Sequence, residues 1–184
     1  MFDTVLIAGL GLMGGSMAKT IKARTLSRVL GWNRTRATAE QALADGSIDA
    51  IATEALYKEA DLVIIGLYPQ ATVDWLLGNM PKMKKGCVIV DMVGVKQFMV
   101  DHLEQAALDA GVHYVGGHPM AGREFSGLDF ALSTLFDGAS MIFVPTKSST
   151  ERVLEQLEAY FMSLGFGQTV RCTAQQHDHM IAFP

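Results

Sequence analysis

Short runs of almost continuous hydrophobic residues alternate along the chain with longer segments in which hydrophobic positions recur every three or four residues. The short runs have the length of strands, and their lack of polar alternation is typical of parallel strands that helices cover on both faces. The sequence therefore predicts strands at residues 4–8, 28–32, 62–67, 87–91, 113–117, 140–145 and 168–172.

The longer segments have the periodicity of amphipathic helices. Clear hydrophobic stripes are formed by Met13, Met17 and Ile21, by Met99, Leu103, Ala106 and Ala110, and by Val153, Leu157, Tyr160 and Leu164. Ser148, with Glu151 three residues later, predicts a capping box at the start of the last of these helices. Strands and helices that alternate through right-handed crossovers predict an α/β protein with a doubly wound, mostly parallel sheet.

Composition and charge narrow the classes of function. The 184 residues are 49% hydrophobic and carry a net charge of −4, which argues against a nucleic-acid partner but leaves room for a local phosphate site. Cys87 and Cys172 lie far apart in hydrophobic runs, so neither a disulfide framework nor a metal site is expected. We find no basic leader and no stretch near the roughly 20 hydrophobic residues that cross a bilayer, so we expect a cytoplasmic protein with no membrane partner.

The first predicted strand runs directly into the sequence GLGLMG at residues 9–14, a GxGxxG pattern that opens the first helix. In this position the first glycine permits a tight turn, the second lets a pyrophosphate approach the backbone, and the third allows close packing of helix on strand. The helix N-terminus adds free amides and a favourable dipole. We therefore predict a Rossmann-type dinucleotide site with contacts from Gly9, Gly11, Leu12, Met13 and Gly14.

The end of the second strand bears on cofactor choice. NAD sites usually place Asp or Glu about 20 residues after the glycines, where the carboxylate binds the ribose 2′-hydroxyl. This chain has no carboxylate there, and the residues in its place are Asn33, Arg34, Thr35 and Arg36. These side chains would accept the 2′-phosphate of NADP, so the pattern favours NADP over NAD. The alternative is that the two arginines are only solvent-exposed residues in the first turn of the next helix.

Two further strand ends reach the edge of the sheet where ligands of open α/β proteins bind. At the end of the predicted strand at residues 62–67, Leu67 and Tyr68 are expected along the nicotinamide half of the cofactor. The alternative for Leu67 is packing in the hydrophobic core. After the predicted strand at residues 87–91, Gly94 is expected near the cofactor. Lys96 follows, and it either contacts substrate or ribose or is a solvated lysine at a helix start.

The sequence GGHPMAG at residues 116–122 delivers His118 to the same edge. The glycines let cofactor and substrate come close, and Pro119 restricts the backbone beside the ring. A histidine suits the oxidation of an alcohol near neutral pH because it can accept the hydroxyl proton as hydride departs. We therefore predict His118 as a general base. The polar residues just beyond it, which could orient or cover a carboxylated substrate, are Arg123, Glu124 and Ser126.

The last twelve residues read TAQQHDHMIAFP and predict the opening of a helix. We accordingly assign residues 1–172 to the dinucleotide-binding domain and residues 173–184 to the start of that helix. The chain then stops, either at a natural end or because a C-terminal domain has been left off. His177 and His179 are two residues apart, so on a helix they diverge and make a poor metal pair.

Several segments together resemble the prephenate/arogenate dehydrogenase family of tyrosine biosynthesis, across essentially the whole chain. They are GLGLMGGSMA, DMVGVK, GGHPMAGREFSG, LFDGASMIFVP and QQHDHMIAF. The glycine turn is shared with many dehydrogenases, whereas HPMAG-x-E-x-SG followed by HD-x-x-x-A is far more specific. The resemblance implies NAD(P)-dependent oxidative decarboxylation of prephenate to 4-hydroxyphenylpyruvate, or of arogenate to tyrosine. It also implies that His118 polarises the ring hydroxyl and takes its proton, and that His177 is a candidate for substrate binding.

The chain departs from the family pattern in two places. Many relatives carry a serine that assists around the reacting hydroxyl, and Gly94 stands in its place here. Family members also continue into an all-helical C-terminal domain, which forms their homodimer and supplies cationic substrate contacts. The resemblance therefore implies that this domain is absent from the 184 residues.

Two rival functions stay open at the level of sequence. A related β-hydroxyacid dehydrogenase or imine reductase would share the GWNRT cofactor loop but would have no need of HPMAG. A module that binds NADP without chemistry would suit a chain that lacks the helical domain, although the retained His118 argues against it. The sequence does not distinguish prephenate from arogenate as substrate.

Overall fold

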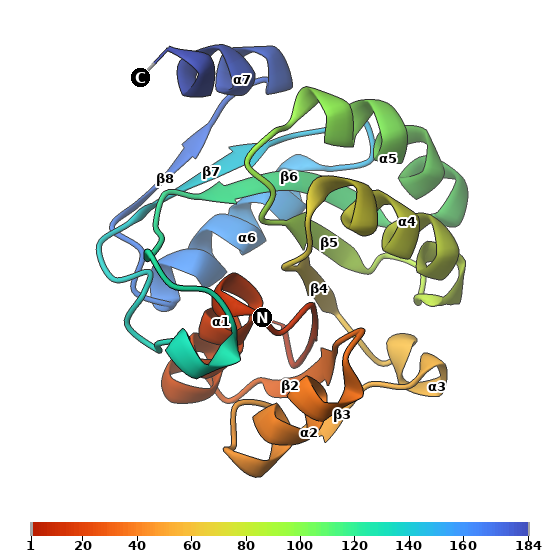
Figure 1. Cartoon of the computed structure of the whole chain (residues 1–184). Helices are drawn as coiled ribbons and strands as arrows, with labels where there is room; N and C mark the ends of the chain where they lie inside the picture. Colours follow the sequence, from red (N-terminus) through yellow and green to blue (C-terminus); the bar gives the residue numbers. More distant parts are fainter. Residues whose placement is uncertain (1, 184) are drawn as a thin grey trace.

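Eight strands form one twisted sheet in the computed structural model, which describes residues 2–183, and helices cover both faces of the sheet (Figure 1). The strands are β1 (Thr4–Ala8), β2 (Arg28–Trp32), β3 (Ala50–Ile51), β4 (Leu62–Ile65), β5 (Val88–Asp91), β6 (His113–Pro119), β7 (Ser140–Val144) and β8 (Gln168–Arg171). The α-helices are α1 (Leu12–Arg24), α2 (Arg36–Ala44), α3 (Glu54–Tyr57), α4 (Pro69–Asn79), α5 (Gln97–Ala110), α6 (Glu151–Ser163) and α7 (Ala174–Ala182). Two 3₁₀ turns are η1 (Met80–Lys82) and η2 (Leu128–Phe130).

The strand order is β3-β2-β1-β4-β5-β6-β7-β8. The chain runs outward from β1 to β2 and β3, then crosses back to β4 on the other side of β1, and both β2 and β4 pair with β1 in parallel. The carboxyl ends of β1 and β4 therefore meet at the point where the winding direction reverses, which is where ligands bind in open α/β sheets. Among the described strands, β6 and β7 form the one antiparallel pair, with His118 opposite Ile142.

Alternate residues of each strand pack into two separate hydrophobic cores. Val5 and Ile7 of β1 pack with residues of α1, α2 and α6, whereas Leu6 and Ala8 pack with residues of α3, α4 and α5. A strand that is covered on both faces needs a hydrophobic side chain at nearly every position. This explains the continuous hydrophobic runs in the sequence.

The predicted α/β class and mostly parallel sheet are confirmed, and each predicted strand is present with ends that shift by at most two residues. The pattern missed β3, which is only two residues long and leaves no hydrophobic run to detect. Within residues 2–183, the helices are too short or too polar to span a membrane.

The predicted capping box at Ser148 and Glu151 is wrong. α6 is capped by Thr150, whose hydroxyl accepts a hydrogen bond from the backbone amide of Val153 at 3.2 Å. Ser148 is buried instead, and its hydroxyl accepts a hydrogen bond from the backbone amide of Tyr114 at 2.9 Å. This serine ties the loop before α6 to β6, so its tertiary contact overrides the local capping pattern.

Candidate active site

The turn between β1 and α1 leaves no room for side chains at two of its glycines. Gly9 has a φ of +93°, and a Cβ there would lie 2.6 Å from the carbonyl oxygen of Gly66. A Cβ on Gly14 would lie 1.7 Å from the carbonyl oxygen of Gly9. Gly11 differs, because no atom lies within 4 Å of the place where its Cβ would stand. α1 thus begins beside open space that a phosphate group could enter.

We expect Gly14→Ala and Gly11→Ala to separate folding from cofactor binding. The methyl group of Gly14→Ala overlaps backbone, so this variant should lose about 2 kcal/mol or more of stability together with dinucleotide binding. Gly11→Ala adds its methyl group in open space, so stability should be unchanged while binding weakens, because the pyrophosphate needs that approach. Urea unfolding and calorimetric titration with NADP and NAD measure the two effects. Equal stabilities of the two variants would contradict the geometry.

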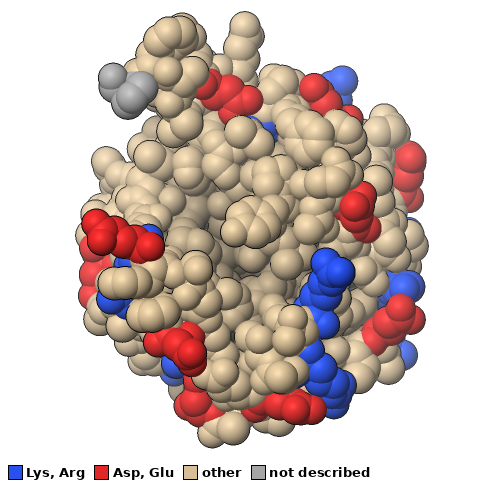
Figure 2. All heavy atoms as spheres, viewed as in Figure 1, with Lys and Arg blue, Asp and Glu red and all other residues tan. Residues whose placement is uncertain are grey.

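A cavity of about 720 Å³ opens in front of this turn, along the carboxyl ends of β1, β2, β4 and β5. Figure 2 shows the hollow near the middle of this face, with charged side chains mainly around it. Three of the predicted cofactor residues, Gly14, Thr35 and Arg36, do not line this cavity. The predicted cofactor residues that line the cavity are Gly9, Gly11, Leu12, Met13, Asn33, Arg34, Leu67, Tyr68 and Gly94.

Leu67 and Tyr68 enter this cavity in different ways. Leu67 packs against the core of α3, α4 and α5 and also lines the cavity. Tyr68 is 85% exposed, and its ring is free to cover a ligand. Pro69 follows at the first position of α4, as expected for a proline that starts a helix.

Asn33 supports the glycine turn. Its Oδ1 accepts a hydrogen bond from the backbone amide of Leu10 at 2.9 Å, and its Nδ2 donates to the carbonyl of Thr35 at 3.1 Å. Arg36 forms an exposed ion pair with Glu40 of α2 at 3.2 Å. This contact fits the alternative of a solvent-exposed arginine in the first turn of the helix. Arg34, in contrast, lines the cavity.

A carboxylate reaches the same region from a distant part of the chain. Asp129 of η2 lines a smaller adjoining cavity of about 310 Å³, together with Gly11 and Asn33. Gln41 of α2 donates a hydrogen bond to its Oδ1 at 2.6 Å. Sequence reasoning missed Asp129 because it considered only the residues that directly follow β2.

His118 stands near the end of β6 with its two ring nitrogens in different surroundings. Nδ1 lies 2.8 Å from Nε2 of His177, while Nε2 lies 3.7 Å from where a Cβ on Gly94 would stand, beside the main cavity. Burial, and then nearby positive charge at His177 and Lys96, lowers the pKa of His118 to about 4. The negative charge of Asp91 opposes this shift without cancelling it. The ring is therefore neutral near pH 7 and can accept a proton.

Lys96 is fully buried, so the alternative of a solvated lysine at a helix start is wrong. Its ammonium forms an ion pair with Asp91. The same carboxylate accepts a hydrogen bond from the hydroxyl of Tyr114 at 2.8 Å. It also accepts from the backbone amides of Val93 at 2.9 Å and Gly117 at 3.3 Å. Because both carboxylate oxygens have hydrogen-bond or ion-pair partners, the free-energy cost of burying this charge is offset.

α7 begins with a complete capping box and brings His177 and Asp178 behind His118. His177, the predicted substrate contact, is fully buried, and its Nδ1 lies 2.8 Å from Oδ1 of Asp178. Asp178 also accepts hydrogen bonds from the backbone amides of Lys96 at 2.8 Å and Gln97 at 3.0 Å, at the start of α5. Sequence reasoning attached no role to Asp178. Across residues 2–183, no group of three or more His, Cys, Asp or Glu side chains could hold a metal ion.

The polar residues that follow β6 lie on an exposed loop. Arg123 donates a hydrogen bond from Nη1 to the carbonyl of Phe130 at 2.6 Å, and its guanidinium lies 5.7 Å from the ring centre of Phe125. Glu124 is exposed. Ser126 lines the main cavity, so it is the member of this group that the fold brings to the cofactor region.

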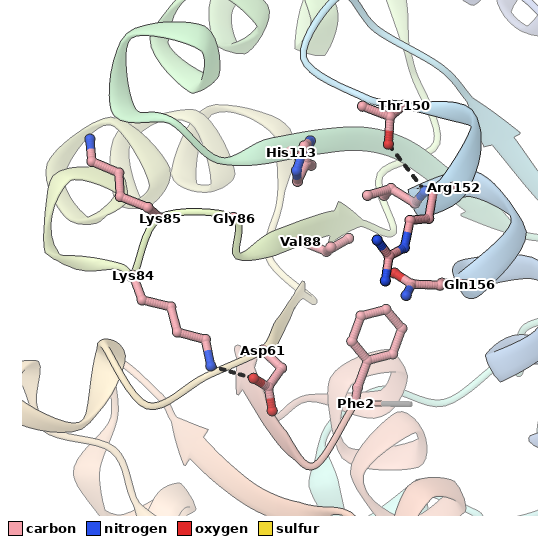
Figure 3. A pocket seen from close by; sticks show the side chains of 11 residues that line it. Phe2, Asp61, Lys84, Lys85, Gly86, Val88, His113, Thr150, Arg152 and Gln156 are labelled. Atoms are coloured by element: carbon pink, nitrogen blue, oxygen red, sulfur yellow. Dashed lines mark hydrogen bonds and ion pairs between the residues drawn. The ribbon is translucent and has the colours of Figure 1, made fainter.

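A second cavity, of about 390 Å³, lies at the amino ends of β4, β5 and β6, on the opposite edge of the sheet (Figure 3). Its cations are Lys84, Lys85 and Arg152. Lys84 forms an ion pair with Asp61, and Lys85 donates a hydrogen bond to the carbonyl of Ala110 at 3.0 Å. Ligands of open α/β sheets bind at the carboxyl ends of the strands, so the main cavity is the better candidate for the cofactor.

The glycine turn, the reversed strand order and the cavity in front of them define a Rossmann-type nucleotide-binding domain. Residues 17–168 match the sequence profile of the family described as prephenate dehydrogenase, nucleotide-binding domain. The chain belongs to this family of oxidoreductases, as the sequence motifs predicted.

Known relatives agree with this assignment. A curated prephenate dehydrogenase of Bacillus subtilis is 34% identical over 183 residues, which are 97% of this chain and 48% of that protein. The arogenate dehydrogenase of Synechocystis superimposes with a TM-score of 0.89 at 26% identity. The prephenate dehydrogenase of A. aeolicus, in complex with hydroxyphenyl propionate and NAD+, superimposes with a TM-score of 0.89 at 25% identity. Both superpositions cover 98% of this chain and 63% of the solved chain. The chain spans about half the length of the curated relatives it matches first.

Proposed function

We propose that this chain binds NADP and carries the catalytic base for the oxidative decarboxylation of prephenate or arogenate. The observation that carries the proposal is the placement of His118. Its Nε2 faces Gly94 at the edge of the main cavity, while its Nδ1 is engaged by His177. A base at this edge lies where a nicotinamide bound along the carboxyl ends of β4 and β5 would end.

The neutral ring of His118 would accept the proton of the substrate ring hydroxyl at Nε2. A bound nicotinamide supplies the hydride acceptor for the hydrogen on the same carbon. Loss of both hydrogens makes that carbon a carbonyl carbon. The ring carboxylate then leaves as carbon dioxide, and the electrons of the broken C–C bond make the ring aromatic. The phenolate oxygen can take the proton back from His118, which leaves the base neutral for the next turnover.

NADP is the proposed cofactor because the end of β2 offers Arg34 and no carboxylate. NAD is the second candidate, and one observation favours it. Asp129 places a carboxylate beside Gly11 and Asn33, where it could bind a ribose hydroxyl or repel a 2′-phosphate. The complex of NAD+ with the A. aeolicus relative points the same way for that protein.

We expect Arg34→Ala to weaken NADP binding about tenfold or more and to leave NAD binding nearly unchanged. The reason is that the guanidinium would pair only with the 2′-phosphate. Arg36→Ala is the matched control, since Arg36 already pairs within α2, and it should change neither affinity. Calorimetric titration of both cofactors measures the effect. Equal losses for NADP and NAD in Arg34→Ala would contradict the preference for NADP.

The function is tested by mixing the chain with NADP or NAD and then with prephenate or arogenate. Absorbance at the wavelength of the reduced nicotinamide follows hydride transfer, and chromatography identifies 4-hydroxyphenylpyruvate or tyrosine. High protein concentration allows a single turnover to be seen. Reduced cofactor with either product supports the proposal. Cofactor binding without reduction contradicts it and favours the module that binds NADP without chemistry.

A further inference from the structure

Two side chains on α7 bear on the proton that His118 carries. We infer that Asp178 and His177 are positioning residues that keep His118 in one tautomer, with its proton on Nδ1 and a free lone pair on Nε2 beside Gly94. The inference rests on the proposed function for its chemical meaning, because it concerns the proposed base. The proton positions themselves can be measured without any turnover.

The direction of the hydrogen bonds is set at Asp178. Burial raises the pKa of this carboxyl group, but the hydrogen bonds from His177 and from the backbone amides of Gln97 and Lys96 outweigh it. The pKa of Asp178 therefore lies below its usual value. An ionised carboxylate can only accept hydrogen bonds. Nδ1 of His177, 2.8 Å from Oδ1 of Asp178, must therefore carry a proton and donate it.

This assignment determines the next hydrogen bond. A neutral imidazole carries one N–H, so a His177 ring with its proton on Nδ1 has a lone pair on Nε2. Nδ1 of His118 lies 2.8 Å from that lone pair and donates to it. Nε2 of His118 is then left as an acceptor at the edge of the cavity. A cationic His177 would instead donate from its Nε2 to Nδ1 of His118, and the proton of His118 would then lie on Nε2.

The other charged groups near the ring do not compete for its nitrogens. Asp91, at the end of β5, and Lys96, at the start of α5, form an ion pair with each other in the interior. Ile142, opposite His118 on β7, carries no charge. Among the hydrogen bonds of the described residues, the ring of His118 is tied to His177 alone. The two residues of α7 are therefore the ones that select its tautomer.

The tautomer matters because its alternative places a hydrogen on Nε2. A ring in that state would offer a donor to the substrate hydroxyl instead of accepting its proton. In serine proteases, removal of the carboxylate that fixes the tautomer of the catalytic histidine lowers kcat by about 10⁴-fold. By the same reasoning we expect His177→Phe to lower kcat by about 10²-fold or more while KM changes little.

The test is a long-range ¹H–¹⁵N correlation spectrum of the chain with ¹⁵N-labelled histidines, recorded between about pH 6 and pH 8. We expect the wild-type spectrum to show His118 with a protonated Nδ1 and an unprotonated Nε2 across this range. A proton on Nε2, or a mixture of both tautomers, would overturn the inference. The wild-type spectrum alone decides this point, so it does not depend on the folding of any variant.

Variants test whether α7 is the cause. His177→Phe keeps a ring in the buried site but removes the acceptor, so His118 should become a mixture of tautomers. Asp178→Asn keeps the size of the side chain and can offer a donor to His177, so it should shift the proton of His118 toward Nε2. His179→Gln, at an exposed position of the same helix, is the control and should leave the spectrum of His118 unchanged. Backbone amide spectra report whether each variant is folded.

The outcomes separate this inference from the proposed function. An unchanged His118 tautomer in folded His177→Phe and Asp178→Asn would overturn the positioning role, even if the wild type oxidises prephenate. A wild-type ring with its proton on Nδ1, in a chain that binds NADP but oxidises neither substrate, would leave the positioning role intact. The proposed function would then fail by itself.

Discussion

His118→Asn lowers the rate of substrate-dependent NADP reduction by about 10²–10⁴-fold, the usual contribution of a positioned general base. The expected loss is large because Nε2 of His118 is the acceptor that faces the cavity beside Gly94, whereas an amide side chain is far too weak a base to take the proton. The variant should bind NADP like the wild type, since no predicted phosphate contact is altered. Stopped-flow absorbance and calorimetric titration measure the two properties.

The pH dependence gives this prediction a second readout. Burial, with the positive charge near the ring, holds the pKa of His118 at about 4, so the base is in its active neutral form at higher pH. The wild-type rate should therefore be flat from neutral pH downward and fall only as the pH approaches 4. A wild-type rate that falls already near pH 6.5, or a variant as fast as the wild type, would contradict the role of His118 as a buried neutral base.

Lys96→Met destabilises the fold by about 3–5 kcal/mol, because it leaves the carboxylate of Asp91 buried without its cation. Urea unfolding measures the free energy of unfolding. Lys82→Met is the matched control, because the Lys82 ion pair with Glu54, at 2.6 Å, lies on the surface. Loss of such an exposed pair should cost no more than about 1 kcal/mol.

A double variant separates the buried charge from the loss of packing. Asp91→Asn added to Lys96→Met removes the stranded negative charge while its amide oxygen still accepts hydrogen bonds. The double variant should therefore recover part of the lost stability. If Lys96→Met proves as mild as Lys82→Met, the interior ion pair does not have the energetic role assigned to it here.

The strands could be predicted from the sequence because burial on both faces of a strand requires a hydrophobic residue at nearly every position. Val63, Ile64 and Ile65 of β4 alternate between the two cores, so all of them are hydrophobic and the run is unmistakable. The hydrophobic pattern does not reveal that β7 runs antiparallel to β6, because a buried strand has the same composition in either direction. The two residues of β3 are held by backbone pairing with β2, which hydropathy does not report.

The parts of the site that are contiguous in sequence were also predictable. The GLGLMG turn and the loop of His118 each need several particular residue types within a few positions, and the fold brings both to one edge of the sheet. Contacts between distant segments were not predictable. His118 and His177 are 59 residues apart, and Asp129 reaches Gln41 across 88 residues. A solvated Lys96 stayed open as an alternative because the sequence does not reveal that Lys96 and Asp91 face the same interior space.

The proposed function requires that a dinucleotide binds at the carboxyl edge of the sheet, with its nicotinamide next to His118. The most direct test is titration of the ¹⁵N-labelled chain with NADP, following backbone amide and histidine ring resonances. We expect the shifts to concentrate at Gly11, Gly94 and the Nε2 of His118, while the amide resonances around the second cavity stay unchanged. Shifts that concentrate instead at Lys85 and Arg152, on the opposite edge, would contradict it.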